Sequence, residues 1–269
     1  MTGPSSKPVI WDPAAYAANS SPQQSWAREV IAKLKLRGDE RVLDVGCGDG
    51  RMTAEIARAL PAGAVTGVDA SSTMIGFAQA TFAPARFSNL EFHVMDARRI
   101  RLAKPFDIVF SSSALHWVDD HPAFLRGASS CLRPGGRLVV SCGGKGNAQE
   151  VFLALRPEMR LPRWRQFFRK MDKPYFFHSP ADYGKWLPRC GFKVRRVRLS
   201  PKNATYQGRE GFEAWLRTTW LPYTQRVPES LREEFIAAIT DRYLAKHRAD
   251  DAGRVCVRMV RLEIDAVKI

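Results

Sequence analysis

The hydrophobic pattern of the first half of the chain predicts short buried strands that alternate with helices. One helix is expected after Gly50 and through Leu60, and a second from about Ser72 to Phe82. The predicted strands are Arg41–Val45, Ala64–Val68, Leu90–Val94, Phe106–Phe110 and Arg137–Ser141, the last entered through a turn at Arg133–Gly136. Strands that alternate with helices at this spacing form a parallel sheet with both faces covered.

The second half of the chain changes its pattern after Cys142. Residues 147–175 and 208–247 are helical in tendency, and the second of these stretches is divided by prolines. Between them, a helix at Pro180–Arg189 leads into a strand at Lys193–Leu199. An alternating apolar pattern at Arg254–Val267 predicts the last strand.

The fold class predicted from these patterns is α/β, with a doubly wound, mostly parallel seven-stranded sheet and helical cap insertions. An amphipathic helix with Trp26, Val30 and Leu34 at helical spacing precedes the sheet. The predicted organisation is an N-terminal helical lid segment at 1–36, the α/β core at 37–146, a helical cap insertion at 147–175, a core continuation at 176–200, a second cap segment at 201–250 and the final core strand at 251–269.

The composition indicates a cytoplasmic globular protein. Apolar residues make up 45% of the 269 residues, which is enough for a substantial core, yet no apolar run approaches the roughly 18 residues of a membrane span. The first residues form no hydrophobic signal segment. The five cysteines are scattered without a C-x-x-C pair, so we expect neither a metal nor a disulfide framework.

The net charge of +15 raises the question of a nucleic-acid partner. The positive residues are spread along the chain, and only Lys193–Arg198 resembles a cluster. That run alternates as a strand does and can be a solvated surface. We therefore expect a small anionic molecule as the partner, rather than nucleic acid or a membrane.

A glycine-rich loop follows the first predicted strand. Its sequence, Asp44-Val-Gly46-Cys-Gly48-Asp-Gly50, has D-x-G-x-G-x-G spacing, and glycine lets backbone N–H groups approach a ligand closely. It differs from the dinucleotide-binding G-x-G-x-x-G motif, because Arg51 stands where the third glycine belongs. The carboxylate of Asp44 suits an ammonium group better than a pyrophosphate. The alternative is an ordinary tight turn.

Two further carboxylates end the second and third predicted strands. Asp69 is placed to accept both hydroxyls of a ribose. Asp96 can take an adenine amino group while the Ala97 N–H meets a ring nitrogen, although a lone Asp at this position can instead be a helix cap. Met74 and Ile75 are expected to flank the base.

These motifs together resemble the class I S-adenosylmethionine-dependent methyltransferases over about residues 40–142. The resemblance rests on Val42–Gly50, Gly67–Asp69, Met95–Ala97, Phe106–Phe110 and Leu132–Gly136. It implies a Rossmann-like methyltransferase fold, S-adenosylmethionine as cofactor and S-adenosylhomocysteine as product. The candidate cofactor-binding residues are Asp44, Gly46, Cys47, Gly48, Gly50, Asp69, Ala70, Met74, Asp96, Ala97 and Ser111.

The segments around this core resemble the trans-aconitate and juvenile-hormone-acid methyltransferases, which esterify carboxylates of small molecules. In that group a glutamine and a tryptophan face the substrate, and they match Gln23 and Trp117. The sequence Ser111–Trp117 also lacks the N/D-P-P-Y/F motif of enzymes that methylate bases or amides. The candidate substrate-binding residues are Tyr16, Gln23, Trp26, Trp117, Arg160, Trp215 and Tyr223.

No residue is assigned a certain catalytic role, since transfer to an anion needs alignment more than acid–base chemistry. His116, Trp117 and Gln23 are candidates to orient the acceptor; His116 could alternatively be a general base with a pKa near neutrality. Arg160, Arg163, Arg165 and Arg217 are candidates to pair a carboxylate, the alternative being ordinary surface positions.

The predicted function is methyl transfer to a small organic acid, at a carboxylate oxygen, by in-line displacement. The alternatives are a methyltransferase acting on RNA or another nucleic acid, and a catalytically idle regulatory protein that binds S-adenosylmethionine.

Overall fold

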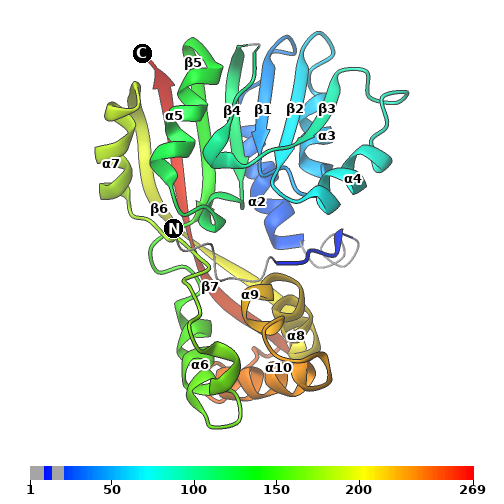
Figure 1. The fold of residues 1–269 in the computed structure, drawn as a ribbon, viewed down its shortest axis with the longest axis vertical. Coiled ribbons are helices and arrows are strands. Elements are labelled where there is room, and N and C mark those ends of the chain that lie inside the picture. The colour runs from blue at the N-terminus through cyan, green and yellow to red at the C-terminus, as the bar shows by residue number, and fades with distance from the viewer. Residues whose placement is uncertain (1–8, 14–20, 104) are drawn as a thin grey trace. The chain divides into compact units, whose positions relative to one another are not determined.

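The computed structural model describes residues 9–13, 21–103 and 105–269 (Figure 1). The chain divides into two compact units. The sheet unit comprises Gln23–Lys145, Tyr175–Ser200 and Val260–Ile269, and the helical unit comprises Gly146–Pro174, Pro201–Met259 and the described part of Met1–Pro22. The division falls within the two longest strands, so each contributes residues to both units.

Seven strands form one sheet in the order β3-β2-β1-β4-β5-β7-β6. Neighbours among β1 to β5 pair in parallel, whereas β7 runs antiparallel to β5. The strands are β1 (Arg41–Val45), β2 (Ala64–Asp69), β3 (Leu90–Val94), β4 (Phe106–Ser112), β5 (Leu132–Gly143), β6 (Phe192–Gln207) and β7 (Arg254–Lys268). The predicted doubly wound, mostly parallel seven-stranded sheet is confirmed.

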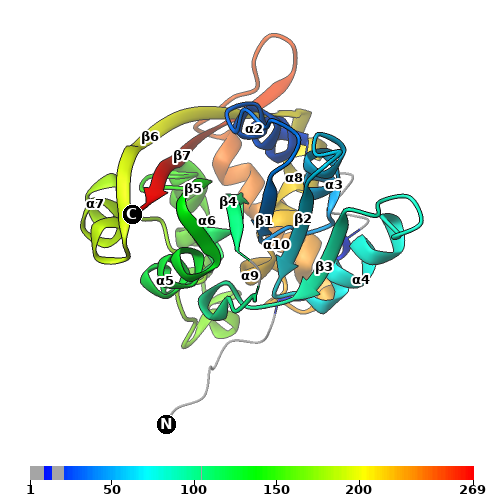
Figure 2. The same ribbon diagram turned by 90° about the horizontal axis from the view of Figure 1, so that it is seen from above.

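Helices cover both faces of this sheet, as Figure 2 shows for α2 and α3 on one side and α5 on the other. The first face carries α2 (Ser21–Ala32), α3 (Arg51–Arg58) and α4 (Ser72–Thr81). The second carries α5 (His121–Cys131) and α7 (Pro180–Arg189). Two short 3-10 turns, η1 (Ala97–Arg99) and η2 (Leu115–Trp117), follow the carboxyl ends of β3 and β4.

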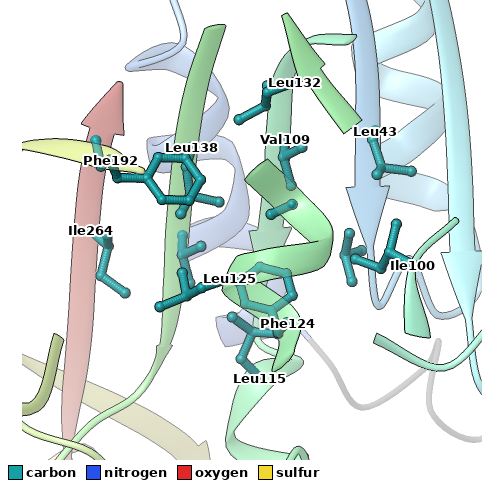
Figure 3. Close-up of a cluster of buried hydrophobic side chains, with 14 of the residues drawn as sticks. Leu43, Ile100, Val109, Leu115, Phe124, Leu125, Leu132, Leu138, Phe192 and Ile264 are labelled. Atoms are coloured by element: carbon teal, nitrogen blue, oxygen red, sulfur yellow. The ribbon is translucent and has the colours of Figure 1, made fainter. Parts of the chain in front are cut away.

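Alternation along the strands divides the core between the two faces. Leu43 and Val109 pack against the side of the sheet that faces Phe124 and Leu125 of α5 (Figure 3). Their neighbours, such as Val42 and Ile108, pack on the opposite face. Because both faces are covered, the strands read as nearly continuous apolar runs.

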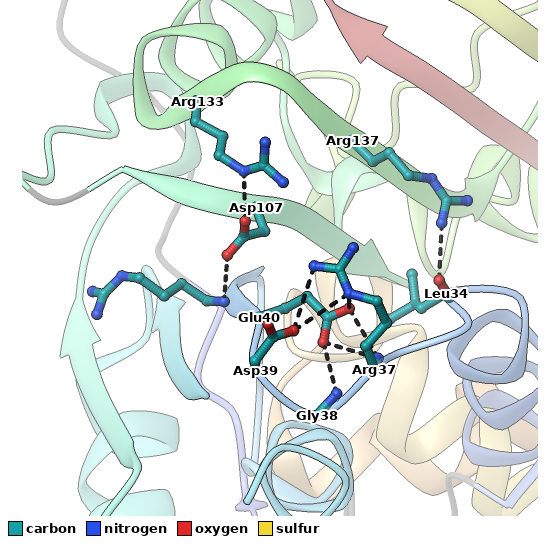
Figure 4. Close-up of polar contacts among 9 residues, drawn as sticks. Leu34, Arg37, Gly38, Asp39, Glu40, Asp107, Arg133 and Arg137 are labelled. Carbon is teal, nitrogen blue, oxygen red and sulfur yellow. Dashed lines mark hydrogen bonds and ion pairs between the residues drawn. The ribbon is translucent and has the colours of Figure 1, made fainter. Parts of the chain in front are cut away.

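Two carboxylates fix the amino edge of the sheet (Figure 4). Glu40, 6% exposed, accepts the backbone N–H groups of Arg37 and Gly38, so it orders the turn before β1. Asp107 of β4 accepts the N–H of Arg41 at 2.7 Å and a side-chain bond from Arg133. These bonds set where β1 begins, at the edge opposite the glycine loop.

The helical unit is built around aromatic side chains. Trp164 packs on Phe235 with ring centroids 5.2 Å apart, and Phe212 stacks on Tyr243 at 4.7 Å. Its elements, beyond the ends of β6 and β7, are α6 (Gln149–Arg160), η3 (Arg165–Phe168), α8 (Gly208–Thr219), α9 (Leu221–Thr224) and α10 (Glu229–Leu244).

Two element boundaries differ from the prediction. β6 continues to Gln207, since its exposed polar residues alternate with half-buried ones beyond the predicted end at Leu199. The predicted turn at Arg133–Gly136 lies inside β5 as an irregularity: Leu132 pairs with Phe106, and pairing resumes only at Arg137 with Ile108. Extra residues in one strand of a pair produce such a local bulge.

Candidate functional site

The glycine loop connects β1 to α3 at the carboxyl edge of the sheet. Gly46, Gly48 and Gly50 all have left-handed backbone conformations, with φ of +76°, +55° and +79°. Residues with a Cβ adopt this region at a cost, so the sequence of the loop is dictated by its backbone. Gly50 is also the residue that precedes the first turn of α3.

The three glycines have different surroundings. A Cβ on Gly46 would lie 2.1 Å from the Cβ of Ala114, and one on Gly50 would lie 2.7 Å from the ring of Phe92. Those two glycines are required by protein packing. Only Gly48 faces open space, with no atom within 4 Å of an added Cβ.

Asp44 lies beneath the loop and is 2% exposed. Its Oδ2 accepts a hydrogen bond of 2.7 Å from the hydroxyl of Thr53 on α3, a residue that the sequence analysis did not single out. Burial raises the pKa of Asp44 to about 7; the Thr53 bond opposes this shift and the nearby charge of Asp69 adds to it. A cation placed beside this carboxyl group would favour its ionised form, which burial disfavours.

Asp69 at the end of β2 touches the loop directly. One carboxylate oxygen accepts the N–H of Gly48 at 3.0 Å, and the other accepts the N–H of Ser71 at 2.9 Å. Burial raises its pKa above the ordinary value, against the effect of these backbone bonds. Asp69 therefore stands beside the open face of Gly48, with the exposed Ala70 next to it.

Asp96 at the end of β3 caps η1, which was the alternative considered for this residue. Its side chain accepts the N–H of Arg98 and also pairs with the Arg98 guanidinium at 2.6 Å. These bonds lower the pKa of Asp96. The same guanidinium reaches Asp119, in the segment after η2, at 3.0 Å. Ala97 begins η1, directly after Asp96.

The other predicted cofactor residues are buried. Ser111 is fully buried, and its hydroxyl donates to the carbonyl of Val45 at 2.7 Å, so the side chain joins β4 to β1. Cys47 and Met74 are 8% and 3% exposed. Ile75 is 2% exposed and packs within the core on the α3 face.

η2 carries His116 and Trp117 just beyond β4. The Nδ1 atom of His116 accepts the backbone N–H of Gly143 at 3.3 Å. Burial lowers the pKa of His116 to about 3; the positive charge of Arg261 adds to this effect, and the neighbouring His121 adds less. This lowered pKa argues against the alternative of a general base with a pKa near neutrality, and the sequence does not show the surroundings that cause it.

An aromatic cluster surrounds this turn. Trp117 lies 4.8 Å from Tyr175 between ring centroids, and Tyr175 stacks on Phe177 at 5.6 Å. The sequence analysis missed Tyr175 and Phe177. No strand or helix ends next to them in the chain, so their position gave no signal.

Arg261 of β7 was also missed, and it is 4% exposed. Its guanidinium donates to the carbonyl of Ser141 at 2.6 Å and to the hydroxyl of Ser113 at 3.0 Å, and it lies over the ring of Trp26 at 5.4 Å. Ser113 has a left-handed φ of +60°, which is costly for a serine and is typical of functional sites. Trp26, predicted to contact substrate, is 8% exposed beneath this guanidinium.

The remaining substrate candidates lie in the helical unit or outside the described residues. Trp215 and Tyr223 are 3% and 8% exposed and pack against Trp220, which matches ordinary core packing. Arg160 is exposed at the end of α6. Tyr16 lies outside the described residues, as does the side chain of Gln23.

The candidate arginines of the helical unit split into two groups. Arg163 is ion-paired with Glu234, and Arg217 with Glu233. Both pairs are on the surface, which matches the alternative that these arginines are ordinary surface residues. Arg165 begins η3 and is exposed.

The residues around Gly48 fit S-adenosylmethionine. An open backbone face, a carboxylate beside it and a buried carboxyl group with a raised pKa suit an adenosyl group joined to a cationic amino acid. Within the part of the chain that the structure describes, no three His, Cys, Asp or Glu side chains gather as metal ligands. The helices of the described residues include none that is long and apolar enough to cross a bilayer.

Comparison with known proteins identifies the family of the chain. A family model described as a methyltransferase domain matches residues 42–136. The trans-aconitate 2-methyltransferase of Deinococcus radiodurans is 36% identical over 250 residues, which covers 91% of this chain and 93% of the relative. That of Shigella flexneri serotype 5b is 32% identical over 257 residues, covering 95% and 97%.

A solved structure shows the same fold at lower sequence identity. The YcgJ protein of Bacillus subtilis is similar with a TM-score of 0.61 and 17% identity, covering 91% of this chain and 98% of that one. The family resemblance found in the sequence motifs is thus confirmed over nearly the whole chain. The chain belongs to the class I S-adenosylmethionine-dependent methyltransferases and is similar to the trans-aconitate methyltransferases among them.

Proposed function

We propose that this methyltransferase transfers a methyl group to a carboxylate oxygen of a small organic acid, forming a methyl ester. The observation that carries the proposal is the similarity to trans-aconitate 2-methyltransferases along nearly the full chain. The sequence after β4, Ser111–Trp117, also lacks the motif of base and amide methyltransferases.

The cofactor site we propose centres on Gly48. S-adenosylmethionine supplies a methyl group on a sulfonium, from which it leaves readily as a cation equivalent. Gly48 provides the open backbone, and Asp69 accepts hydrogen bonds from the ribose hydroxyls. Asp44 contributes negative charge near the cofactor's ammonium group. Ala97 offers its backbone N–H to the adenine ring.

For Asp96, binding of the adenine amino group requires an exchange of partners. Its carboxylate accepts several bonds from Arg98, and the adenine amino group would replace part of them. The Arg98 guanidinium keeps its contact with Asp119 as this happens. We therefore expect Asp96 to contribute less to affinity than Asp69, which accepts hydrogen bonds from the backbone N–H groups of Gly48 and Ser71.

On the acceptor side, we propose that Trp117 and Gln23 contact the organic acid. Trp117 stands beyond the carboxyl end of β4, and ligands of open α/β sheets bind at that edge. Ser111 and Ile75 take structural roles in this proposal, as their packing indicates. Chemistry then depends on alignment of the carboxylate with the methyl group and on exclusion of water.

The direct test is a panel of acceptors with purified protein and S-adenosylmethionine, analysed by mass spectrometry. The panel contains trans-aconitate, other di- and tricarboxylates, and the matching amides and alcohols. We expect a product heavier by one methylene group from at least one acid and from none of the matched compounds. Asp69→Ala serves as the control for contaminating activity. Methylation of the amides or alcohols in place of the acids would refute the proposal.

A further inference from the structure

The hydrogen bond from Gly143 fixes the protonation pattern of His116. Nδ1 accepts the backbone N–H at 3.3 Å, so it cannot carry a proton of its own. A neutral imidazole has one donor and one acceptor nitrogen, and the proton must therefore be on Nε2. The ring consequently presents an N–H donor on its other edge.

His116 is also held in place near the cofactor loop. Its ring lies 5.7 Å from Trp117, 6.1 Å from Tyr175 and 6.0 Å from Phe177, measured between centroids. Two residues earlier, Ala114 lies so close to Gly46 that no Cβ fits between them. The turn that carries the imidazole is thus packed directly against the glycine loop.

The groups that face the ring keep it neutral. Arg261 on β7 and His121 on α5 both disfavour a positive charge on His116, and the surrounding partners, Trp117, Tyr175 and Phe177, supply no carboxylate. With burial, these groups bring the pKa to about 3. At pH 7 the ring is therefore neutral, and it is a very weak proton acceptor.

We propose that His116 donates a hydrogen bond from Nε2–H to the oxygen anion of the methyl acceptor and takes up no proton during the reaction. This inference rests on the proposed function and narrows the substrate class to acids that are already ionised at the working pH. Arg261 is a positioning residue, which holds Ser113, Ser141 and Trp26 around the turn.

The reaction balances without a proton transfer. A lone pair of the carboxylate oxygen forms the new bond to the methyl carbon, the carbon–sulfur bond breaks, and its electron pair stays on sulfur. The methylated carboxyl group becomes a neutral ester group, and the sulfonium becomes a neutral thioether. An alcohol or an ammonium acceptor would release a proton, and His116 could not hold it.

A neutral hydrogen-bond donor also suits a reaction in which the acceptor carboxylate loses its charge. The carboxylate loses its negative charge as the new bond forms, so a strong cationic partner would stabilise the ground state more than the transition state. A neutral N–H orients the acceptor and stabilises the ground state less than a cation would. Burial and the positive charge of Arg261 therefore favour catalysis, because they keep His116 neutral.

The first experiment observes the ring without any turnover. Protein with ¹⁵N-labelled histidine, with and without S-adenosylmethionine, is titrated from pH 8 to pH 5 by NMR, and His116→Gln identifies the signal. We expect a neutral ring protonated on Nε2 at every pH. A ring that titrates within this range, or one protonated on Nδ1, would overturn the proposal.

The second experiment compares two variants on an acid that the wild type methylates, with trans-aconitate as the first probe. Gln can accept from Gly143 and donate as Nε2–H does, whereas Leu can do neither. We expect His116→Gln to lower kcat/KM by less than about tenfold and His116→Leu by roughly 10- to 100-fold, mainly through KM. A general base would make His116→Gln fall by about 10²-fold or more.

The outcomes separate the two proposals. Equal damage from both variants, on an acid that the wild type does methylate, would overturn the role of His116 alone. Methylation of neutral alcohols or of amines in place of acids would overturn the proposed function and this inference together. An acid-methylating enzyme with a Gln-tolerant position 116 supports both.

Discussion

Replacing Asp44 by Asn should stabilise the folded protein while weakening the cofactor site. Burial raises the pKa of this carboxyl from 3.8 to about 7, a shift of about three units, and each unit corresponds to 1.36 kcal/mol. The folded pKa is the higher one, so ionised Asp44 destabilises the fold. The penalty is absent below pH 3.8, grows between pH 3.8 and 7, and reaches about 4 kcal/mol at most above pH 7.

Asn removes this penalty and keeps an oxygen that can accept the Thr53 hydroxyl. We expect the free energy of unfolding, measured by urea denaturation at pH 8 without cofactor, to rise by about 1–4 kcal/mol. The gain should shrink towards pH 4. Binding of S-adenosylmethionine, measured by calorimetry at pH 8, should weaken by about tenfold or more, since the charge near the ammonium is lost.

Thr53→Val is the matched control, because it removes the partner and keeps the carboxylate. It should destabilise the protein at pH 8, since the hydrogen bond that lowers the pKa of Asp44 is lost. An Asp44→Asn variant that is no more stable than the wild type at pH 8 would refute the reasoning, and so would an unchanged dissociation constant for the cofactor.

Three further predictions concern the loop and the N-terminus. Asp69→Ala should weaken cofactor binding by about 1.5–3 kcal/mol in calorimetry, the scale of hydrogen bonds to a charged group; an unchanged constant in a folded variant would place the ribose elsewhere. Gly46→Ala should lower the melting temperature strongly, because its Cβ would overlap Ala114. Gly48→Ala should cost only about 1 kcal/mol of stability and should mainly reduce cofactor affinity. If the two variants changed stability and cofactor affinity equally, the different roles given to these glycines would be wrong. Deleting residues 1–24, which removes Gln23, should abolish methyl transfer and reduce cofactor affinity less, with circular dichroism showing a folded sheet unit; a fully active truncated protein would show that Gln23 is not needed.

The architecture of the sheet could be predicted because it is encoded locally. Apolar runs such as Arg41–Val45 and Leu90–Val94 have the bounds of β1 and β3 in the structure. The glycine loop was recognisable from spacing alone, since left-handed backbone conformations demand glycine. The antiparallel pairing of β7 with β5 had no local signal, because strand direction depends on the path of the intervening chain.

The chemistry of individual side chains was harder to foresee, since it depends on contacts between distant residues. Arg261 looked like an outward-facing position of an alternating strand, but β7 is buried on both faces there. The pKa of His116 depends on its burial and then on Arg261 and His121, which its own segment does not reveal as neighbours. Asp96 and Arg98 are only two positions apart in the sequence. An acidic cap followed by an arginine could therefore have suggested that they form an ion pair.

The account's central claim is that the transferred methyl group ends on a carboxylate oxygen. The most direct measurement uses S-adenosylmethionine labelled with ¹⁴C in the methyl group, trans-aconitate and related acids as acceptors, and mild alkaline hydrolysis of the product. A methyl ester releases its label as volatile methanol under these conditions, whereas a methyl group on nitrogen or carbon stays with the product. We predict volatile label that depends on the acid and is reduced with Asp69→Ala. Label that remains on the product after alkali would contradict the claim.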